Sequence, residues 1–85
     1  MDNVVTREAV EDVFRVLMVE RGTPLTAVDR KLPLYEGGYG LDSMDTATLS
    51  AMLADQFERD PYSFGKFPRT LGEIQDWYAA DFSAK

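Results

Sequence analysis

The alternation of hydrophobic and polar residues in the first quarter of the chain predicts a helix. Hydrophobic residues recur there at intervals of three and four, which is the spacing of one helical face. Thr6 stands just before this stretch, and Gly22 allows the left-handed conformation that ends many helices. The following Thr23 and Pro24 support a stop at that point. We therefore expect a first helix between Thr6 and Gly22, with one buried face formed by Val10, Val13, Phe14, Leu17 and Met18.

A second helix is predicted from Asp42 or Ser43 to near Arg59. Its hydrophobic residues are spaced i, i+3, i+4 and i+8, so they form a single stripe along one side. The stripe that we expect to be buried consists of Leu49, Met52, Leu53 and Phe57.

Two further helices are predicted after the second. Asp60 and Pro61 fit an N-cap and a first helical position, so we expect a short helix from Pro61 to Phe64 that Gly65 closes. Further on, a threonine is followed three residues later by a glutamate, which is the spacing of a capping box. This pattern predicts a last helix that runs to about residue 80, and its capping and apolar positions are Thr70, Leu71, Glu73, Ile74, Trp77 and Tyr78.

The segment between Gly22 and Asp42 is long and rich in glycine and proline, and its hydrophobic residues follow no clear period. A connection of this length in a small domain is usually functional or disordered. Its spaced hydrophobic residues predict that it packs across the helices. The expected fold is all-α: residues 1–85 form one domain, a small four-helix bundle with three main helices and one short helix.

Composition excludes several classes of function. The chain has no histidine and no cysteine, so we expect neither acid–base catalysis nor a metal centre. Its formal net charge of −6 would repel nucleic acid and favours protein partners with basic surfaces, although acidity also aids solubility alone. No long hydrophobic run and no signal-like N-terminus are evident. We expect a cytoplasmic monomer without membrane insertion.

Asp42 and Ser43 lie where the long connection meets the second helix. Either side chain can cap the first helical turn, which is a common structural role for such a pair. A phosphodiester on Ser43 would also be favoured there, because unbonded amides and the positive end of the helix dipole attract an anion by about 0.3 to 1 kcal/mol at an exposed site. The residues alone leave both roles open.

The run from Gly40 to Asp45 (GLDSMD) resembles the modification motif of the acyl carrier protein family, which includes the peptidyl carriers. The resemblance continues through the second helix and into the last one, so it covers nearly the whole chain. It is carried there by Leu49, Leu53 and Phe57 and by the run from Thr70 to Ile74 (TLGEI).

The resemblance implies that a phosphopantetheinyl transferase attaches 4′-phosphopantetheine from coenzyme A to Ser43. The terminal thiol of that arm would hold an acyl or aminoacyl cargo as a thioester. Ser43 would then be an attachment point, and the protein would be a carrier rather than an enzyme. Asp42 and Asp45 resemble the acidic neighbours that basic side chains of the transferase and of other partners recognise, and both can also cap the helix.

The outward face of the second helix departs from the pattern of bacterial fatty-acid carriers. Thr48, Ala51 and Ala54 are uncharged where those carriers commonly place acids or large apolar groups, and Met44 is expected to be an exposed apolar contact. Along this face of the second helix, negative charge comes only from Asp42, Asp45 and Asp55. We therefore expect a polyketide, nonribosomal peptide or other small-acyl pathway, whose loading and processing enzymes present basic or apolar docking surfaces.

Other interpretations remain. The chain could be a carrier-like helical module that binds a basic protein without modification. A small hydrolase with Ser43 as nucleophile is disfavoured, because the chain lacks histidine and no strand precedes the serine. Five aromatic residues outside the main helices either border the cargo or only pack: Tyr35, Tyr39, Tyr62, Phe64 and Phe67.

Overall fold

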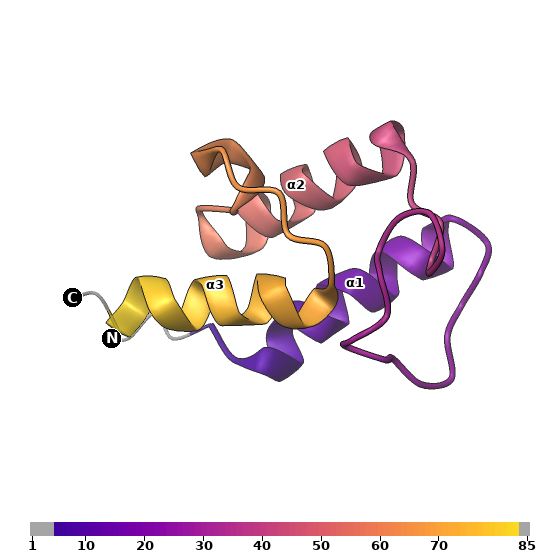
Figure 1. Ribbon diagram of the computed structural model, residues 1–85, viewed down its shortest axis with the longest axis horizontal. Helices are drawn as coiled ribbons and strands as arrows, with labels where there is room; N and C mark the ends of the chain where they lie inside the picture. Colours follow the sequence, from indigo (N-terminus) through magenta and orange to yellow (C-terminus); the bar gives the residue numbers. More distant parts are fainter. Residues whose placement is uncertain (1–4, 84–85) are drawn as a thin grey trace.

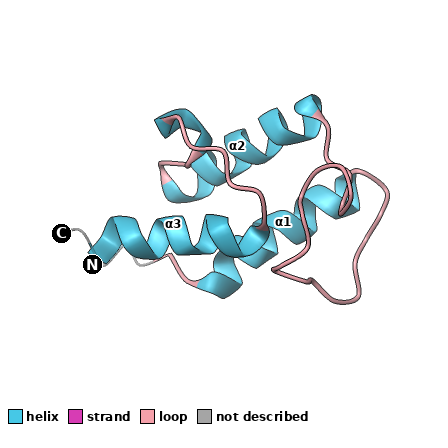
Figure 2. Cartoon of the chain, viewed as in Figure 1, coloured by secondary structure: helices cyan, strands magenta, loops and turns pink. Residues whose placement is uncertain are grey.

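The computed structural model describes residues 5–83 and contains three α-helices and one 3-10 turn (Figures 1 and 2). No β-strand occurs within these residues, where an isolated bridge pairs Pro33 with Thr70. The prediction of an all-α fold is confirmed. The expected domain also includes residues 1–4 and 84–85, which lie outside the described part. The elements, in order, are α1 (Arg7–Glu20), α2 (Ser43–Phe57), the turn η1 (Tyr62–Phe64) and α3 (Leu71–Ser83).

Both ends of α1 follow the local signals in the sequence. The Thr6 side chain accepts a hydrogen bond from the Ala9 amide at 3.0 Å, which caps the N-terminus. At the other end Gly22 has a φ of 88°, and its amide bonds to the Val19 carbonyl at 2.9 Å. The Thr23 amide bonds to the carbonyl of Met18, which completes a Schellman motif. The predicted limits of this helix are confirmed.

The C-terminal end of α2 differs from the prediction. The helix ends at Phe57, two residues before the expected end near Arg59. Glu58 takes the left-handed conformation, with a φ of 68°, and its amide bonds to the Ala54 carbonyl. A non-glycine residue seldom adopts this conformation, so the sequence carried no signal for the earlier stop.

The prediction of a fourth helix is not confirmed. The segment after Pro61 forms only a 3-10 turn, Tyr62–Phe64. The Asp60 carboxylate accepts a hydrogen bond from the Ser63 amide at 3.2 Å, and Gly65, with a φ of 80°, ends the turn at once. These two features close the chain on itself before a second turn can form.

The start of α3 is capped by the two residues that the sequence indicated. The Thr70 hydroxyl accepts from the Glu73 amide at 3.1 Å, as expected. The Glu73 carboxylate accepts from the amide of Arg69 rather than from that of Thr70. The helix extends to Ser83, beyond the expected end near residue 80. None of the helices in residues 5–83 is long and apolar enough to cross a membrane.

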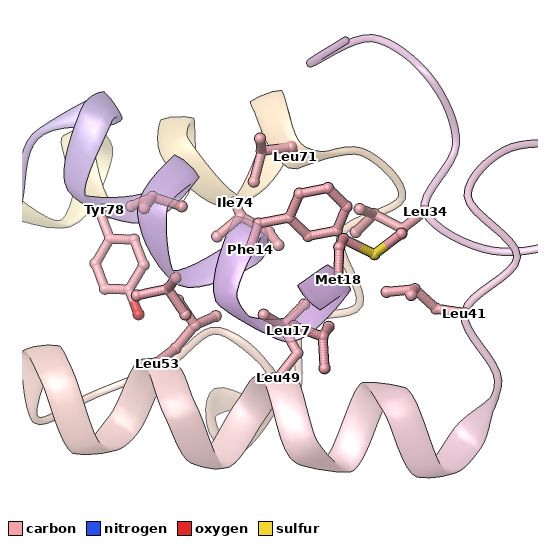
Figure 3. Close-up of a cluster of buried hydrophobic side chains, with 12 residues drawn as sticks. Phe14, Leu17, Met18, Leu34, Leu41, Leu49, Leu53, Leu71, Ile74 and Tyr78 are labelled. Carbon is pink, nitrogen blue, oxygen red and sulfur yellow. The ribbon is translucent and has the colours of Figure 1, made fainter. Parts of the chain in front are cut away.

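Helix α1 contacts both α2 and α3. The hydrophobic core lies between α1 and the inner faces of the other two helices (Figure 3). All five residues of the stripe predicted for α1 are buried. In α2, Leu49 and Leu53 are buried, while Met52 and Phe57 pack against the edge of the core. The remaining buried hydrophobic residues of the core are Leu34, Leu41, Leu71, Ile74 and Tyr78.

The connection between α1 and α2 packs against the helices, as its hydrophobic residues predicted. Leu34 and Leu41 enter the core, and the Leu34 amide bonds to the Arg69 carbonyl at 2.8 Å. The segment folds tightly on itself at Gly38, where an added Cβ would lie 1.8 Å from the Pro33 carbonyl oxygen. Only glycine fits this approach. The fold of this connection thereby fixes the position at which α2 begins.

Candidate functional site

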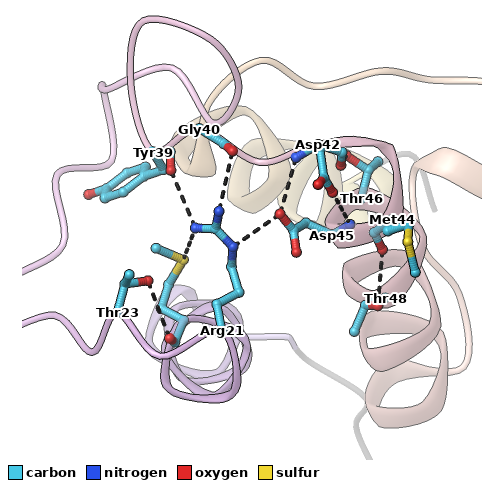
Figure 4. Close-up of polar contacts among 10 residues, drawn as sticks. Arg21, Thr23, Tyr39, Gly40, Asp42, Met44, Asp45, Thr46 and Thr48 are labelled. Atoms are coloured by element: carbon cyan, nitrogen blue, oxygen red, sulfur yellow. Dashed lines mark hydrogen bonds and ion pairs between the residues drawn. The ribbon is translucent and has the colours of Figure 1, made fainter.

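Ser43 is the first residue of α2, and its side chain is exposed. The residue before it, Asp42, is the N-cap, and a reciprocal capping box fixes the first turn (Figure 4). The Asp42 carboxylate accepts from the Asp45 amide at 2.8 Å, and the Asp45 carboxylate accepts from the Asp42 amide at 3.1 Å. The predicted helix start and the capping role of both aspartates are confirmed.

The capping box changes the electrostatic expectation for Ser43. The Asp45 amide, and to a lesser degree the Met44 amide, hold the pKa of Asp42 below its usual value. The Asp42 carboxylate therefore occupies the Asp45 amide, which is one of the amides that we expected to favour a phosphate. The positive end of the α2 dipole remains as the favourable contribution to an anion on Ser43.

Asp45 is not a free surface charge. Its carboxylate forms an ion pair with the Arg21 guanidinium at 3.0 Å, and its side chain is only 18% exposed. The same guanidinium donates to the carbonyls of Tyr39 and Gly40, each at 3.4 Å (Figure 4). Arg21 thus connects the end of α1, the end of the long connection and the start of α2. No sequence pattern indicated this role of Arg21, because no local spacing links residues so far apart in the chain.

The outward face of α2 is arranged largely as predicted, although Ala54 is only partly exposed. Met44 is 77% exposed, and Thr48, Ala51 and Asp55 follow it on the exposed side of the helix at intervals of four, three and four residues. The Thr48 hydroxyl donates to the Met44 carbonyl at 3.0 Å. This exposed strip is largely uncharged and ends in the carboxylate of Asp55.

A groove of about 400 Å³ lies beside Ser43, and we call it the Ser43 groove. The rings of Tyr35 and Phe67 stack there, with centroids 4.9 Å apart and planes inclined by 12°. The complete lining is Tyr35, Leu41, Asp42, Ser43, Thr46 and Phe67.

The loop aromatics differ in their surroundings. Tyr35 and Phe67 border the Ser43 groove, whereas Tyr39 packs edge-on against Phe14 with centroids 5.0 Å apart. The ring of Phe64 packs against that of Trp77, with centroids 5.5 Å apart. The stacking of Tyr35 on Phe67 could not be read from the sequence, because it brings together two separate loops.

Comparison with known proteins gives no relative for this chain. No family model matches the sequence, and searches of curated proteins and of solved structures found no match. The interpretation of the site therefore depends on its own residues and geometry.

Proposed function

We propose that this protein is a carrier that holds acyl or aminoacyl intermediates as thioesters on a 4′-phosphopantetheine arm at Ser43. The observation that carries the proposal is the exposed Ser43 hydroxyl at the first position of α2, next to an open groove. This position leaves the hydroxyl accessible to a modifying enzyme. The motif around it resembles that of the acyl carrier family.

The chemistry of the chain supports attachment over catalysis. A serine needs an adjacent base to act as a nucleophile in turnover, and the sequence contains no histidine. In the transfer from coenzyme A, the Ser43 oxygen would form a bond to the phosphorus that carries pantetheine, the pyrophosphate linkage would break, and adenosine 3′,5′-bisphosphate would leave. The serine proton would pass to a base of the transferase, so Ser43 needs no base of its own. The arm would add a thiol to a chain that has no cysteine. The dipole of α2 favours the phosphate at the attachment point.

The proposed partners are a phosphopantetheinyl transferase and the enzymes that load and process the cargo, in the cytoplasm. The exposed strip of Met44, Thr48 and Ala51 offers them an apolar contact, and Asp55 offers a carboxylate to a basic residue at its edge. Asp42 contributes a charged carboxylate next to Ser43. Because this strip carries little charge, the proposal favours a polyketide, nonribosomal peptide or other small-acyl pathway over housekeeping fatty-acid synthesis.

Intact-mass measurement tests the proposal. After incubation with coenzyme A and a promiscuous transferase, the protein should gain the mass of one phosphopantetheinyl group, and Ser43→Ala should gain none. Thr26→Ala is the matched control, because it removes another exposed hydroxyl, in the long connection and outside both the Ser43 groove and the exposed strip of α2, and should leave modification intact. A thiol reagent should then titrate one group in each modified molecule, since the chain has no cysteine.

Two results would overturn the proposal. One is modification of Ser43→Ala to the same extent as the parent. The other is no modification of the parent by transferases that modify an established carrier in the same assay. The second result would favour the remaining candidate, an unmodified helical module that binds a basic protein.

A further inference from the structure

The aromatic wall of the Ser43 groove is held rigidly although it is open to solvent. Phe67 is 65% exposed, yet one side of its ring lies flat against Tyr35. The Tyr35 hydroxyl donates to the Pro68 carbonyl and accepts from Tyr62, each at 2.8 Å. The Tyr62 ring also meets Phe67 edge to face, with centroids 5.9 Å apart. These contacts fix an apolar surface beside Ser43 without covering it.

Two polar side chains that line the groove have partners within the protein. The Thr46 hydroxyl donates to the Asp42 carbonyl at 2.9 Å, and the Asp42 carboxylate accepts from the Asp45 amide at 2.8 Å. The groove therefore offers mainly aromatic and aliphatic surface to a ligand. It suits a compact, branched hydrocarbon group better than an amide or a charged group.

We propose that the Ser43 groove binds the tethering arm itself, with the dimethyl-substituted section of 4′-phosphopantetheine against Phe67 and Tyr35. The inference rests on the proposed function. Ser43 lines the groove, so any group attached to its oxygen begins at the groove wall. The dimethyl carbon lies one methylene beyond the phosphate in the arm, and it is the bulkiest apolar group near the attachment point.

A weak site is sufficient for this role, because attachment to Ser43 makes binding intramolecular. A short flexible tether gives an effective concentration in the millimolar range. A groove with only millimolar affinity for the free arm would then be about half occupied in the modified protein. The arm would rest against the protein surface for much of the time and would leave it when a partner enzyme takes the thioester.

The position of the methyl signals of the arm tests this inference by proton NMR. In the modified parent both methyl signals should move upfield from their positions in free phosphopantetheine, because they lie over aromatic rings. They should also show through-space contacts to the ring protons of Phe67 or Tyr35. Phe67→Leu keeps an apolar side chain but removes the ring, so most of the shift should disappear while the mass gain remains.

Phe64→Ala is the matched control. Phe64 is 62% exposed, similar to Phe67, but it packs on Trp77 and does not line the groove. This variant should keep the full shift. Methyl signals at their free positions in a protein with the correct mass gain would overturn the groove proposal alone. A full-sized shift that persists in Phe67→Leu without through-space contacts to Tyr35 would also overturn it, whereas the absence of any mass gain would overturn the carrier function as well.

Discussion

Asp60 shows how a single buried side chain holds two elements together. It is 1% exposed, and one of its carboxylate oxygens accepts from the Ser50 hydroxyl of α2 at 2.6 Å. The same oxygen also accepts from the Ser63 amide at 3.2 Å, and the other oxygen accepts from the Ser63 hydroxyl at 2.7 Å. A buried carboxylate is tolerated because several donors satisfy it. The sequence indicated Asp60 as a cap for the following turn, but not its link to α2.

Replacement of Asp60 by alanine should destabilise the protein by about 1.5 to 3 kcal/mol, the range for hydrogen bonds to a charged group. The two serines would lose their acceptor, and the turn η1 would lose its attachment to α2. Urea unfolding followed by circular dichroism gives the free energy. Asp55→Ala is the control, because this exposed aspartate of α2 should change stability by less than about 0.5 kcal/mol. Equal losses in the two variants would contradict the structural role of Asp60.

At the scale of the elements, helix existence followed from sequence because its causes are local. Periodic hydrophobic residues and the caps at Thr6, Asp42 and Thr70 placed all three α-helices. The errors occurred where no local pattern exists. A left-handed Glu58 carries no signature, and the segment after Pro61 is too short for a hydrophobic period to distinguish a helix from one 3-10 turn.

The candidate site was predictable only in part for a related reason. The cap at Asp42, the start of the helix at Ser43 and the outward position of Met44 depend on one helix, and the sequence predicted them. The ion pair of Asp45 with Arg21 depends on how the long connection folds back, so it appeared only in the structure. An experiment on Asp45 must therefore distinguish recognition by a partner enzyme from the loss of the ion pair with Arg21.

Arg21→Met should loosen the end of the long connection and slow the modification of Ser43. The guanidinium contacts to Asp45, Tyr39 and Gly40 would be lost, and with them the link between the end of the long connection and the start of α2. Amide hydrogen exchange should become faster in residues 39–45. Arg15→Met is the control, because Arg15 of α1 makes similar contacts, to Glu11 and to the Leu25 carbonyl, away from Ser43.

Combining Arg21→Met with Asp45→Asn separates the two roles of Asp45. If Asp45 acts only by holding Arg21, the double variant should be modified no more slowly than the slower single variant. If the transferase also reads the Asp45 carboxylate, Asp45→Asn should slow modification further in the Arg21→Met background. A modification rate of Arg21→Met equal to that of the parent would contradict the positioning role of Arg21.

At the scale of the whole molecule, tyrosine hydroxyls are distributed through the packed structure. The Tyr78 hydroxyl donates to the Arg59 carbonyl at 2.6 Å, and Tyr62 and Tyr35 share a hydrogen bond beside the Ser43 groove. Burial is the main cause that raises the pKa of all three side chains above the usual value of 10.0. The charge of Asp60 raises the pKa of Tyr62 and Tyr78 further.

These shifts predict that the fold becomes less stable in alkaline solution. Above pH 10 the tyrosines lose their protons in the unfolded chain while the folded protein retains them. The unfolded state then binds fewer protons, so the free energy of unfolding falls as pH rises, by up to about 1.4 kcal/mol per pH unit for each such tyrosine. Below pH 10 both states keep the protons, and these groups add no pH dependence.

Urea unfolding at pH 8, 9, 10 and 11, followed by circular dichroism, measures this dependence, and tyrosinate absorbance should rise together with unfolding. Tyr78→Phe distinguishes the tyrosine effect from general charge repulsion, which also grows at high pH in a chain of net charge −6. The variant should be less stable at pH 8, because the bond to the Arg59 carbonyl is lost, yet its stability should fall less steeply above pH 10. If Tyr78→Phe and the parent lost stability with the same slope, the buried hydroxyl of Tyr78 would not be a source of the alkaline transition, and repulsion among the carboxylates would account for it instead.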